Sequence, residues 1–309
     1  MGILIVGAGA TGGYFGARLA QAGRDVTFLV RSRRADQLRQ RGLRIVGPAA
    51  TADESEVVIP RLVMADQLSG FADVVLLSVK ATALESAMAD FAPAVGPHTA
   101  VVPFLNGMGH LATLSKRFGD EAVLGGVLIV ATQLNDQGDI VKLAPGASLT
   151  IGTQDGHPSP RLDAAYQQLS GAGFDVSISD EIVAQMWAKW VFIATVGALT
   201  GIMRGTVGDI VAVPGGSDLG PAILAETSAV AAAAGYPVPD DRLAGIRQTV
   251  TQAGSGTTSS LSRDVSEGHP AEVEPVLGDL SRRGAELGVP TPLLDLATMN
   301  LRIYNNKLG

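Results

Sequence analysis

The residues best suited to chemistry near the start of the chain are the glycines of a short turn. An apolar stretch, Ile3–Val6, leads directly into this turn, and a helical pattern follows it. A strand, a G-x-G-x-x-G turn and a helix in this order form the phosphate-binding corner of a dinucleotide fold. Similar glycine-rich turns occur in other loops, but this one directly follows the first predicted strand. We therefore predict that a dinucleotide cofactor contacts the six residues of the turn, which are Gly7, Ala8, Gly9, Ala10, Thr11 and Gly12.

An arginine follows the second predicted strand, Val26–Val30. An NAD-binding fold usually has Asp or Glu there, against the ribose hydroxyl. A guanidinium instead attracts the 2′-phosphate that a carboxylate would repel, so Arg31 predicts NADP(H) as the cofactor. Residues 31–44 contain six arginines. We interpret three of these, Arg39, Arg41 and Arg44, as a solvated helix face.

Two of the five lysines stand at positions that suit a reaction. Lys80 follows the apolar strand 74–79, at the edge where open α/β sheets bind ligands, although a surface lysine would also close a strand in this way. Lys189 interrupts the apolar segment 186–193. A lysine in that setting either snorkels to solvent or reaches into a cleft where desolvation lowers its pKa. An ammonium of lowered pKa is suited to protonate a developing alkoxide.

Other candidate residues lie in polar turns. Asn106 follows the strand ending at Phe104 and presents an amide at the sheet edge, unless the Asn-Gly pair is a simple turn. Ser260 is a candidate to bond a substrate carboxylate, and Glu272 is a candidate to contact Lys189 or a ribose. Paired serines are also typical of helix caps. The four histidines have no metal-ligand spacing, so we predict no metal site.

Apolar runs alternate with helical patterns in the first half of the chain, which predicts a mainly parallel, doubly wound sheet. Besides the first two strands and 74–79, we expect strands at residues 57–59, 100–104, 123–130, 148–151 and 174–178, with a helix at 13–22. From residue 180 onward the pattern is helical, with helices at 181–196, 218–234, 240–253, 271–287 and 293–307. Ser217 or Asp218 is the expected N-cap of the second of these. The predicted architecture is a Rossmann-type α/β domain, residues 1–179, followed by an all-α substrate and dimerisation domain, residues 180–309.

Composition excludes several classes of protein. The 309 residues suffice for two domains with their own cores. The net charge of −7 disfavours a binder of nucleic acid or of anionic membranes. The chain has no cysteine, which excludes disulfides and thiolate chemistry. No signal peptide and no uncharged apolar stretch of membrane-spanning length is visible, so we expect a soluble cytoplasmic protein.

Taken together, these residues give the chain a resemblance to the ketopantoate reductase (2-dehydropantoate 2-reductase) family over nearly its whole length. The positions that match the family in order are the turn 7–12, Arg31, Lys80, Asn106 to Gly109, Lys189, Ser260 and Glu272. The resemblance implies NADPH-dependent reduction of a 2-oxo acid to a 2-hydroxy acid, as from ketopantoate to pantoate in pantothenate biosynthesis. It implies that Lys189 donates the proton and that Asn106 holds nicotinamide and substrate. Ser260 would then hold the substrate carboxylate, and Glu272 would contact the cofactor.

The chain departs from the family where substrate amides are usual. Ile193 and Gly197 stand where the proton-donor helix commonly has asparagines, and Val207 stands at a further such position. Each lost amide forfeits about 0.5–1.5 kcal/mol of neutral hydrogen bonding. We therefore expect a substrate other than ketopantoate, a more apolar 2-oxo acid, with Trp187, Trp190, Ile193 and Met203 as pocket candidates unless they form core.

Two other functions fit parts of the pattern. A non-catalytic NADP(H) sensor would use the same turn but would leave Lys189 without a purpose. Another two-domain dehydrogenase would not need the Asn106–Gly109 element together with Ser260 and Glu272. Related enzymes often form dimers, so we expect a homodimer through the apolar late helices, unless those helices fill their own core.

Overall fold

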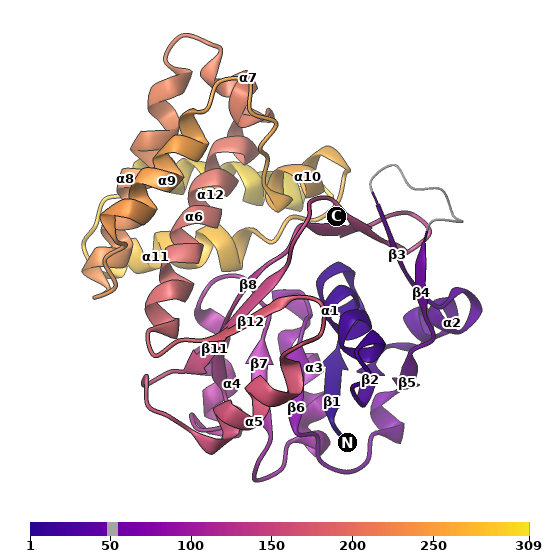
Figure 1. Cartoon of the computed structure of the whole chain (residues 1–309). Coiled ribbons are helices and arrows are strands. Elements are labelled where there is room, and N and C mark those ends of the chain that lie inside the picture. Colours follow the sequence, from indigo (N-terminus) through magenta and orange to yellow (C-terminus); the bar gives the residue numbers. More distant parts are fainter. Residues whose placement is uncertain (48–54, 309) are drawn as a thin grey trace. The chain divides into compact units, whose positions relative to one another are not determined.

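The computed structural model describes residues 1–47 and 55–308 (Figure 1). Contacts along the chain divide it into two compact units. Unit 1 comprises Met1–Leu105 and His110–Val183, and unit 2 comprises Asn106–Gly109 and Ala184–Gly309. The division therefore falls after Val183, four residues beyond the expected domain boundary. It also assigns the turn 106–109, which interrupts unit 1 in sequence, to the helical unit.

Unit 1 is built on a five-stranded sheet in the order β5-β2-β1-β6-β7, in which every pair is parallel. The predicted parallel α/β fold is thus confirmed. Strands β1, β2, β6 and β7 are buried at every position, which explains their continuous apolar sequences, whereas the edge strand β5 is only partly buried. Their bounds are Ile3–Val6 (β1), Val26–Leu29 (β2), Arg61–Val63 (β5), Val74–Leu77 (β6) and Ala100–Pro103 (β7). Because the strands are parallel, the residues that follow β1, β2 and β6 share one edge of the sheet.

Within its described residues, unit 1 also contains five α-helices. They are α1 (Ala10–Gln21), α2 (Ser32–Arg41), α3 (Leu84–Phe91), α4 (Gly109–Phe118) and α5 (Pro160–Leu169), with short 3₁₀ turns at Ala65–Gln67, Ala81–Ala83 and Ala92–Ala94. Helix α1 starts three residues earlier than expected, directly after Gly9. It contacts β1 and β2 as well as β3, β4, β9 and β10 of a second sheet, so it is covered by two sheets.

Two smaller sheets differ from the expected single sheet. One has the order β4-β3-β10-β9 and contains Leu43–Val46 (β3), Glu56–Val58 (β4), Thr132–Leu134 (β9) and Ile140–Lys142 (β10). The other has the order β12-β11-β8 and contains Leu124–Ile129 (β8), Ser148–Thr153 (β11) and Asp175–Ile178 (β12). Strands β3, β5, β9 and β10 were missed because they are short and only partly buried, so they lack the continuous apolar sequence of β1, β2, β6 and β7. The strand expected at residues 174–178 is present as β12, the last strand of unit 1, and it pairs with β11.

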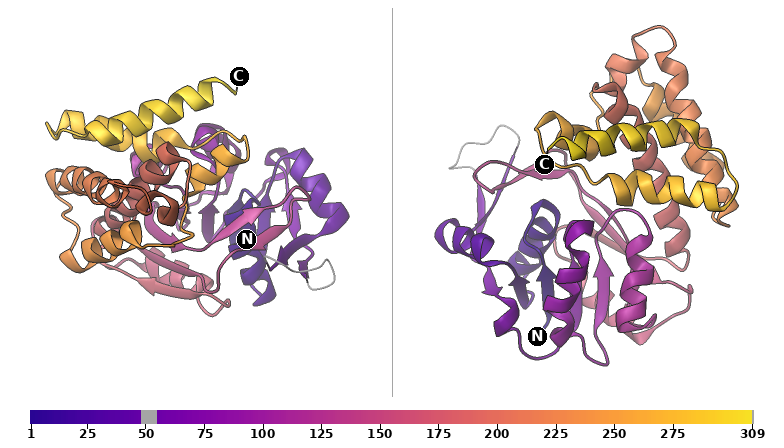
Figure 2. Two further views of the ribbon diagram at one scale, coloured as in Figure 1. Left: turned by 90° about the horizontal axis from the view of Figure 1, so that it is seen from above. Right: turned by 180° about the vertical axis from the view of Figure 1, so that it is seen from behind.

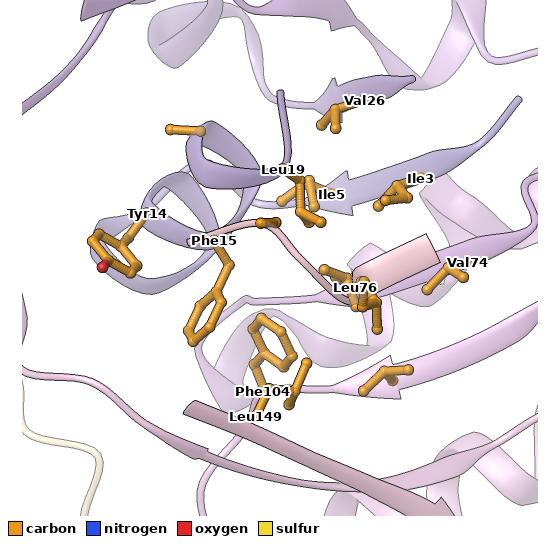
Figure 3. Packing of buried hydrophobic residues seen from close by; sticks show 14 of the residues in the cluster. Ile3, Ile5, Tyr14, Phe15, Leu19, Val26, Val74, Leu76, Phe104 and Leu149 are labelled. Atoms are coloured by element: carbon orange, nitrogen blue, oxygen red, sulfur yellow. The ribbon is translucent and has the colours of Figure 1, made fainter. Parts of the chain in front are cut away.

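The core of unit 1 forms where α1 packs on the main sheet (Figure 3). Phe15 of α1 is fully buried and meets Phe104 and Phe174 edge-to-face, with ring centroids 5.2 and 4.8 Å apart. Three aromatic residues far apart in sequence therefore pack together beside β1, the strand that leads into the glycine turn. This packing holds the start of α1 against the end of β1.

Unit 2 is helical, as expected. Its helices are α6 (Ile182–Met203), α7 (Val207–Val211), α8 (Gly216–Ala233), α9 (Asp240–Thr251), α10 (Ser260–Ser266), α11 (Asp279–Glu286) and α12 (Pro292–Asn306). Figure 2 shows α12 in yellow, and it contacts α8 and α11. The short helices α7 and α10 were missed because five to seven residues carry too little periodicity.

Two helix starts differ from expectation. The N-cap of α8 is Gly215, at φ 81°, and neither Ser217 nor Asp218 caps it. The expected helix 271–287 begins instead with a π-helical segment, Glu274–Gly278, before α11. Pro275 lies inside this segment and has no N–H to donate to an α-helical ladder. Single π turns of this kind often occur at functional sites.

Helix α6 is long and apolar enough to cross a membrane by length and composition, and no other helix of residues 1–47 and 55–308 meets that test. Lys189 interrupts this stretch, so no uncharged apolar run of that length is visible in the sequence. In its most apolar window 61% is buried inside the protein. A core helix of a globular domain has this composition, and Trp190, Val191 and Ala194 of α6 are buried in unit 2.

Candidate functional site

The glycine turn has the backbone that a phosphate-binding corner requires. Gly7 adopts φ +95°, and a Cβ there would lie 2.4 Å from the carbonyl oxygen of Ser78. A Cβ on Gly12 would lie 2.3 Å from the carbonyl oxygen of Gly7. Both contacts are far shorter than a carbon and an oxygen tolerate, so only glycine lets α1 start this close to β1 and to the residue after β6.

Gly9 differs from its two neighbours in the motif. Its φ of −79° is open to any residue, and a Cβ there would meet no protein atom within 4 Å among the described residues. Gly9 also caps α1, and the first bond of the helical ladder runs from Gly13 N–H to the Gly9 carbonyl. The N–H groups of Ala10, Thr11 and Gly12 therefore lie outside the ladder, at the positive end of the helix dipole. This arrangement fits a pyrophosphate.

Arg31 and Lys80 occupy the edge of the sheet next to this turn. Arg31 is exposed at the N-cap of α2, and its Nη2 donates to Ser86 Oγ of α3 at 2.9 Å. Lys80 is exposed three residues after β6, and its side chain has no hydrogen-bond or ion-pair partner among residues 1–47 and 55–308. The order β2-β1-β6 brings the two cations to either side of the glycine turn. Ser86, which orients Arg31, gave no signal in the sequence.

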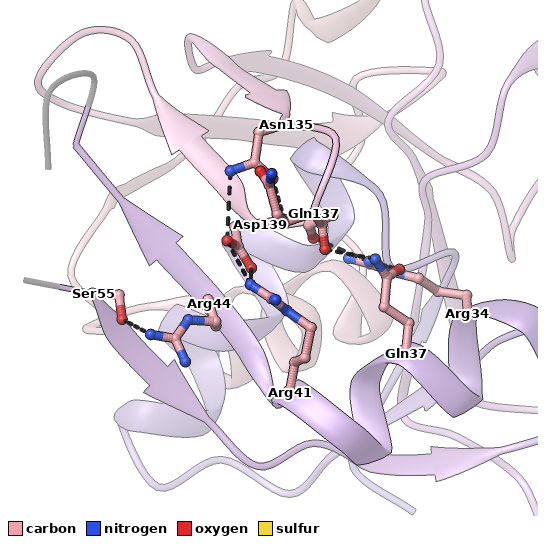
Figure 4. A network of polar contacts seen from close by, with 9 residues as sticks. Arg34, Gln37, Arg41, Arg44, Ser55, Asn135, Gln137 and Asp139 are labelled. Carbon is pink, nitrogen blue, oxygen red and sulfur yellow. Dashed lines mark hydrogen bonds and ion pairs between the residues drawn. The ribbon is translucent and has the colours of Figure 1, made fainter. Parts of the chain in front are cut away.

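The interpretation of three arginines as a solvated helix face holds for Arg39 and Arg41, which are exposed on α2, but is wrong for Arg44 (Figure 4). Arg41 Nη2 lies 3.1 Å from both carboxylate oxygens of Asp139, a residue only 9% exposed. Arg44 belongs to strand β3 rather than to a helix, and its Nη2 donates to Ser55 Oγ at 2.6 Å. Arg39 pairs with Asp36 at the surface, and Arg41 is also exposed although it reaches Asp139. The error arose because charge alone does not distinguish a helix face from a sheet contact.

Asn106 and its turn belong structurally to unit 2. The turn continues from β7, and Gly107 at φ +77° faces the π-helical segment: a Cβ there would lie 2.1 Å from the carbonyl oxygen of Pro275. Gly107 and Met108 are buried, whereas Asn106 is half-buried. The turn is thus held by backbone packing that only glycine permits, and this leaves the Asn106 amide at a fixed place in unit 2.

Lys189 lies on α6 among apolar residues and is half-buried. Desolvation by the surrounding protein lowers its pKa from the usual 10.5 to about 8, and no neighbouring charge contributes. Its ammonium has no ion pair among the described residues, so the expected contact with Glu272 is absent from this structure. A lysine with this pKa is still mostly protonated near neutral pH and gives up its proton more readily than a solvated one.

Of the two late polar candidates, Ser260 is the first residue of a helix, and Glu272 lies close in sequence to the π-helical segment. Ser259, not Ser260, caps α10: its Oγ accepts from Ser262 N–H at 3.0 Å and bonds Thr200 Oγ1 at 2.8 Å. Ser260 is exposed at the first position of α10 and so keeps its hydroxyl free of the cap. Glu272 is half-buried two residues before the π-helical segment.

The three positions that replace the family's asparagines are not equivalent. Ile193 is half-buried on α6. Gly197 is buried, and a Cβ there would lie 3.0 Å from Leu261 Cδ1, so Leu261 lies where a longer side chain would extend. Val207 is fully buried at the start of α7. The apolar side chain of Leu261 therefore occupies the space beside position 197, and Val207 is part of the core.

The tryptophans of α6 are core residues rather than free pocket walls. Trp187 and Trp190 are 2% and 1% exposed. Trp190 Nε1 donates to the Val276 carbonyl of the π-helical segment at 2.8 Å, and Trp187 stacks on Tyr236. Met203, at the end of α6, is 47% exposed. Among the residues that the structure describes, no group of three or more His, Cys, Asp or Glu side chains is placed to hold a metal ion.

Comparisons with known proteins find relatives over nearly the whole chain. The family model "Ketopantoate reductase PanE/ApbA" matches residues 3–156, and its C-terminal counterpart matches residues 181–305. An uncharacterized oxidoreductase of Bacillus subtilis, YkpB, is 31% identical over 98% of this chain and 99% of its own length. A ketopantoate reductase of Ralstonia eutropha has TM-score 0.87 and 28% identity, covering 100% of this chain and 99% of that one.

A further solved structure shares the fold at lower identity. It is a ternary complex of D-mandelate dehydrogenase with NADH and anilino(oxo)acetate, with TM-score 0.87 and 22% identity, covering 100% of this chain and 99% of that chain. Both family models together match most of the sequence, and the resemblance found from the motifs is thereby confirmed. The chain belongs to the ketopantoate reductase PanE/ApbA family of oxidoreductases.

Proposed function

We propose that the protein reduces a 2-oxo acid to the 2-hydroxy acid with NADPH. The observation that carries the proposal is Lys189, an ammonium without a carboxylate partner whose pKa burial lowers to about 8. A structural lysine gains nothing from such a position, because desolvation costs free energy that no ion pair offsets. A general acid does gain, because its proton is transferred more readily.

The residues of unit 1 fit the cofactor. The open space at Gly9 and the first N–H groups of α1 suit a pyrophosphate, and Arg31 and Lys80 suit the added 2′-phosphate. The D-mandelate dehydrogenase of the same fold was solved with NADH, which supports a nicotinamide cofactor but not the choice between its two forms. Arg31, in a place where NAD enzymes usually have a carboxylate, favours NADPH.

The proposed chemistry divides between cofactor and protein. When bound, NADPH supplies a hydride to the carbonyl carbon of the 2-oxo acid and becomes NADP⁺. Lys189 donates the proton that the carbonyl oxygen takes up, so the product is a neutral hydroxyl. Asn106 positions the reacting groups through its amide, Ser260 bonds the substrate carboxylate, and Glu272 bonds the cofactor. Each of these side chains is at least partly exposed.

We propose a substrate more apolar than ketopantoate. Leu261 stands against Gly197 and Val207 is buried, so at these two positions no amide is available to bond a substrate hydroxyl. A site built to bond a substrate hydroxyl binds analogues without that hydroxyl less tightly. An apolar site instead binds the analogue without the hydroxyl more tightly. The oxo acid bound to D-mandelate dehydrogenase, which carries an aromatic group, shows that this fold accepts such a compound elsewhere.

A panel of 2-oxo acids tests this substrate class. We expect kcat/KM for branched or aromatic 2-oxo acids to exceed that for ketopantoate by about tenfold or more, since one or two lost hydrogen bonds are worth that much. The measurement is NADPH oxidation followed by absorbance, with pyruvate as a small apolar control. Turnover of ketopantoate far above every alternative would contradict the proposed substrate class and would leave the reductase itself intact.

Cofactor choice is tested at Arg31. The Arg31→Ala variant should raise KM for NADPH about 10- to 100-fold, the value of a charged hydrogen bond, and leave KM for NADH unchanged. Arg33→Ala, two residues along and also exposed, is the matched control and should change neither. An equal rise in KM for both cofactors would show that Arg31 does not bind the 2′-phosphate.

The assembly and place of action are part of the same proposal. We propose a cytoplasmic homodimer, since Leu296, Met299 and Ile303 form an exposed apolar stripe on α12 at helical spacing. Burial of such a stripe against a second copy would remove it from water. Light scattering at several concentrations gives the mass directly.

A further inference from the structure

Arg34 is the one arginine of the α2 segment that contacts the glycine turn in the described part of the chain. Its Nε donates to the Ala8 carbonyl at 2.9 Å, and its Nη1 donates to the Gly138 carbonyl at 3.0 Å. Its Nη1 also donates to Gln37 Oε1, and Figure 4 shows Arg34 and Gln37 side by side. Gln37 in turn donates from Nε2 to the Gln137 carbonyl at 2.7 Å. The guanidinium therefore links three segments that are far apart in sequence: the turn after β1, helix α2 and the hairpin between β9 and β10.

The hairpin is shaped to receive this side chain. Gly138 adopts φ +78°, and a Cβ there would lie 2.1 Å from Gln37 Nε2 and 2.7 Å from Arg34 Nη1. A second contact fixes the same hairpin, because Arg41 of α2 binds both carboxylate oxygens of Asp139. The hairpin backbone is thus held in place, and only glycine at position 138 leaves room for the guanidinium.

The bond to Ala8 determines the direction of the next N–H. In a trans peptide the C=O and the following N–H point to opposite sides of the chain, and no described peptide bond is cis. With the Ala8 carbonyl turned to Arg34, the Gly9 N–H is directed away from it. Gly9 is also the motif residue at which a Cβ would meet no protein atom within 4 Å.

We propose that Arg34 is a positioning residue for the cofactor: by holding the Ala8 carbonyl, it presents the Gly9 N–H to the pyrophosphate. This inference rests on the proposed nicotinamide dinucleotide. The Nε and Nη1 groups of Arg34 bond Ala8, Gln37 and Gly138, so these donors hold the protein and do not bind the cofactor directly. Its role is distinct from that of Arg31, which faces Ser86 and is free to bind a 2′-phosphate.

The difference between the two arginines gives a direct test. Adenosine 2′-phosphate carries the phosphate assigned to Arg31 but no pyrophosphate. Dissociation constants of NADPH and of adenosine 2′-phosphate are measured by calorimetry for the wild type and for Arg34→Gln. We expect Kd for NADPH to rise about 10- to 100-fold, as for a charged hydrogen bond, and Kd for adenosine 2′-phosphate to change less than about twofold. Equal weakening of both ligands, or of neither, would overturn the proposal.

Two further variants test whether the position of the Arg34 side chain, and not its charge or a general loss of stability, determines NADPH affinity. Gly138→Ala keeps every charge but displaces the Arg34 and Gln37 side-chain ends, so it should also weaken NADPH selectively. Arg39→Gln, on the same helix with only Asp36 as partner, should change neither constant. If Arg34→Gln fails to fold, the comparison of Gly138→Ala with Arg39→Gln decides. If the wild type binds neither nucleotide, the proposed cofactor is wrong, which is a different result from loss of selectivity.

Discussion

Replacing Lys189 by Met is expected to lower kcat about 100- to 10,000-fold while the protein becomes more stable. The loss of rate follows because no other cation is assigned to the carbonyl oxygen, and a positioned general acid contributes about that factor. Methionine keeps the length and most of the volume of lysine, so the packing of α6 is retained. Affinity for NADPH should stay within a few-fold, measured by titration, because the cofactor contacts are assigned to other residues.

The gain in stability comes from removing a desolvated charge. The lowering of the Lys189 pKa from 10.5 to about 8 corresponds to about 3 kcal/mol at most. Below pH 8 both the folded and the unfolded chain carry the proton, and the folded state bears this full cost. Between pH 8 and 10.5 only the unfolded chain binds the proton, so the stability of the wild type rises with pH.

Lys189→Met should therefore be about 1–3 kcal/mol more stable at pH 7 in chemical denaturation. The difference should shrink as the pH is raised through 8 to 10.5. Lys116→Met is the control, because Lys116 is exposed at the end of α4. It should change neither kcat nor stability by more than about 0.5 kcal/mol. If the wild type is active and Lys189→Met turns over at the same rate, Lys189 is not the acid. If neither protein turns over any 2-oxo acid, the sensor is favoured over the enzyme.

Replacing Gly9 by Ala is expected to abolish tight NADPH binding without unfolding the protein. The added Cβ meets no described protein atom within 4 Å and the backbone has φ −79°, so Tm should change by only a few degrees. The same methyl group projects into the space assigned to the pyrophosphate. Kd for NADPH should rise at least about tenfold, and a larger rise follows if the phosphate is forced off the helix N–H groups.

Gly12→Ala provides the contrasting result from the same motif. Its Cβ would lie 2.3 Å from the Gly7 carbonyl oxygen and 2.7 Å from Ser78 Cβ, so α1 must move away from β1. Here the free energy of unfolding should fall by the cost of overpacking a core, about 1–3 kcal/mol or more, and Tm should fall with it. If Gly9→Ala bound NADPH as tightly as the wild type, the glycine turn would not be the phosphate site.

Much of the fold of unit 1 was predictable because burial on both faces leaves a direct signature. Strands β1, β2, β6 and β7 are continuous apolar runs, and each was placed within two residues of its observed ends. Strands β9 and β10 were missed because a strand of three residues that is only partly buried has no clear periodicity of its own. Their position depends on contacts with α2 from more than 90 residues away, such as that between Arg41 and Asp139.

The candidate site was predictable to the extent that its chemistry depends on residue type. A lysine within an apolar helix and a glycine motif after a strand are visible in the sequence, and the structure adds the lowered pKa of Lys189 and the open side of Gly9. Arg34 was not predicted, because nothing in the run of arginines marks the one that reaches the Ala8 carbonyl. Leu261 was missed for the same reason: only the folded chain brings it to Gly197.

The central claim is that the ammonium of Lys189 protonates the substrate oxygen, and the pH dependence of kcat tests it most directly. With saturating NADPH and 2-oxo acid, the rate of NADPH oxidation should be constant below pH 8. It should then fall about tenfold for each pH unit above it, as the acid is lost. The residual rate of Lys189→Met should not show this decline. A wild-type rate that stayed level from pH 7 to about pH 10 would contradict the assignment.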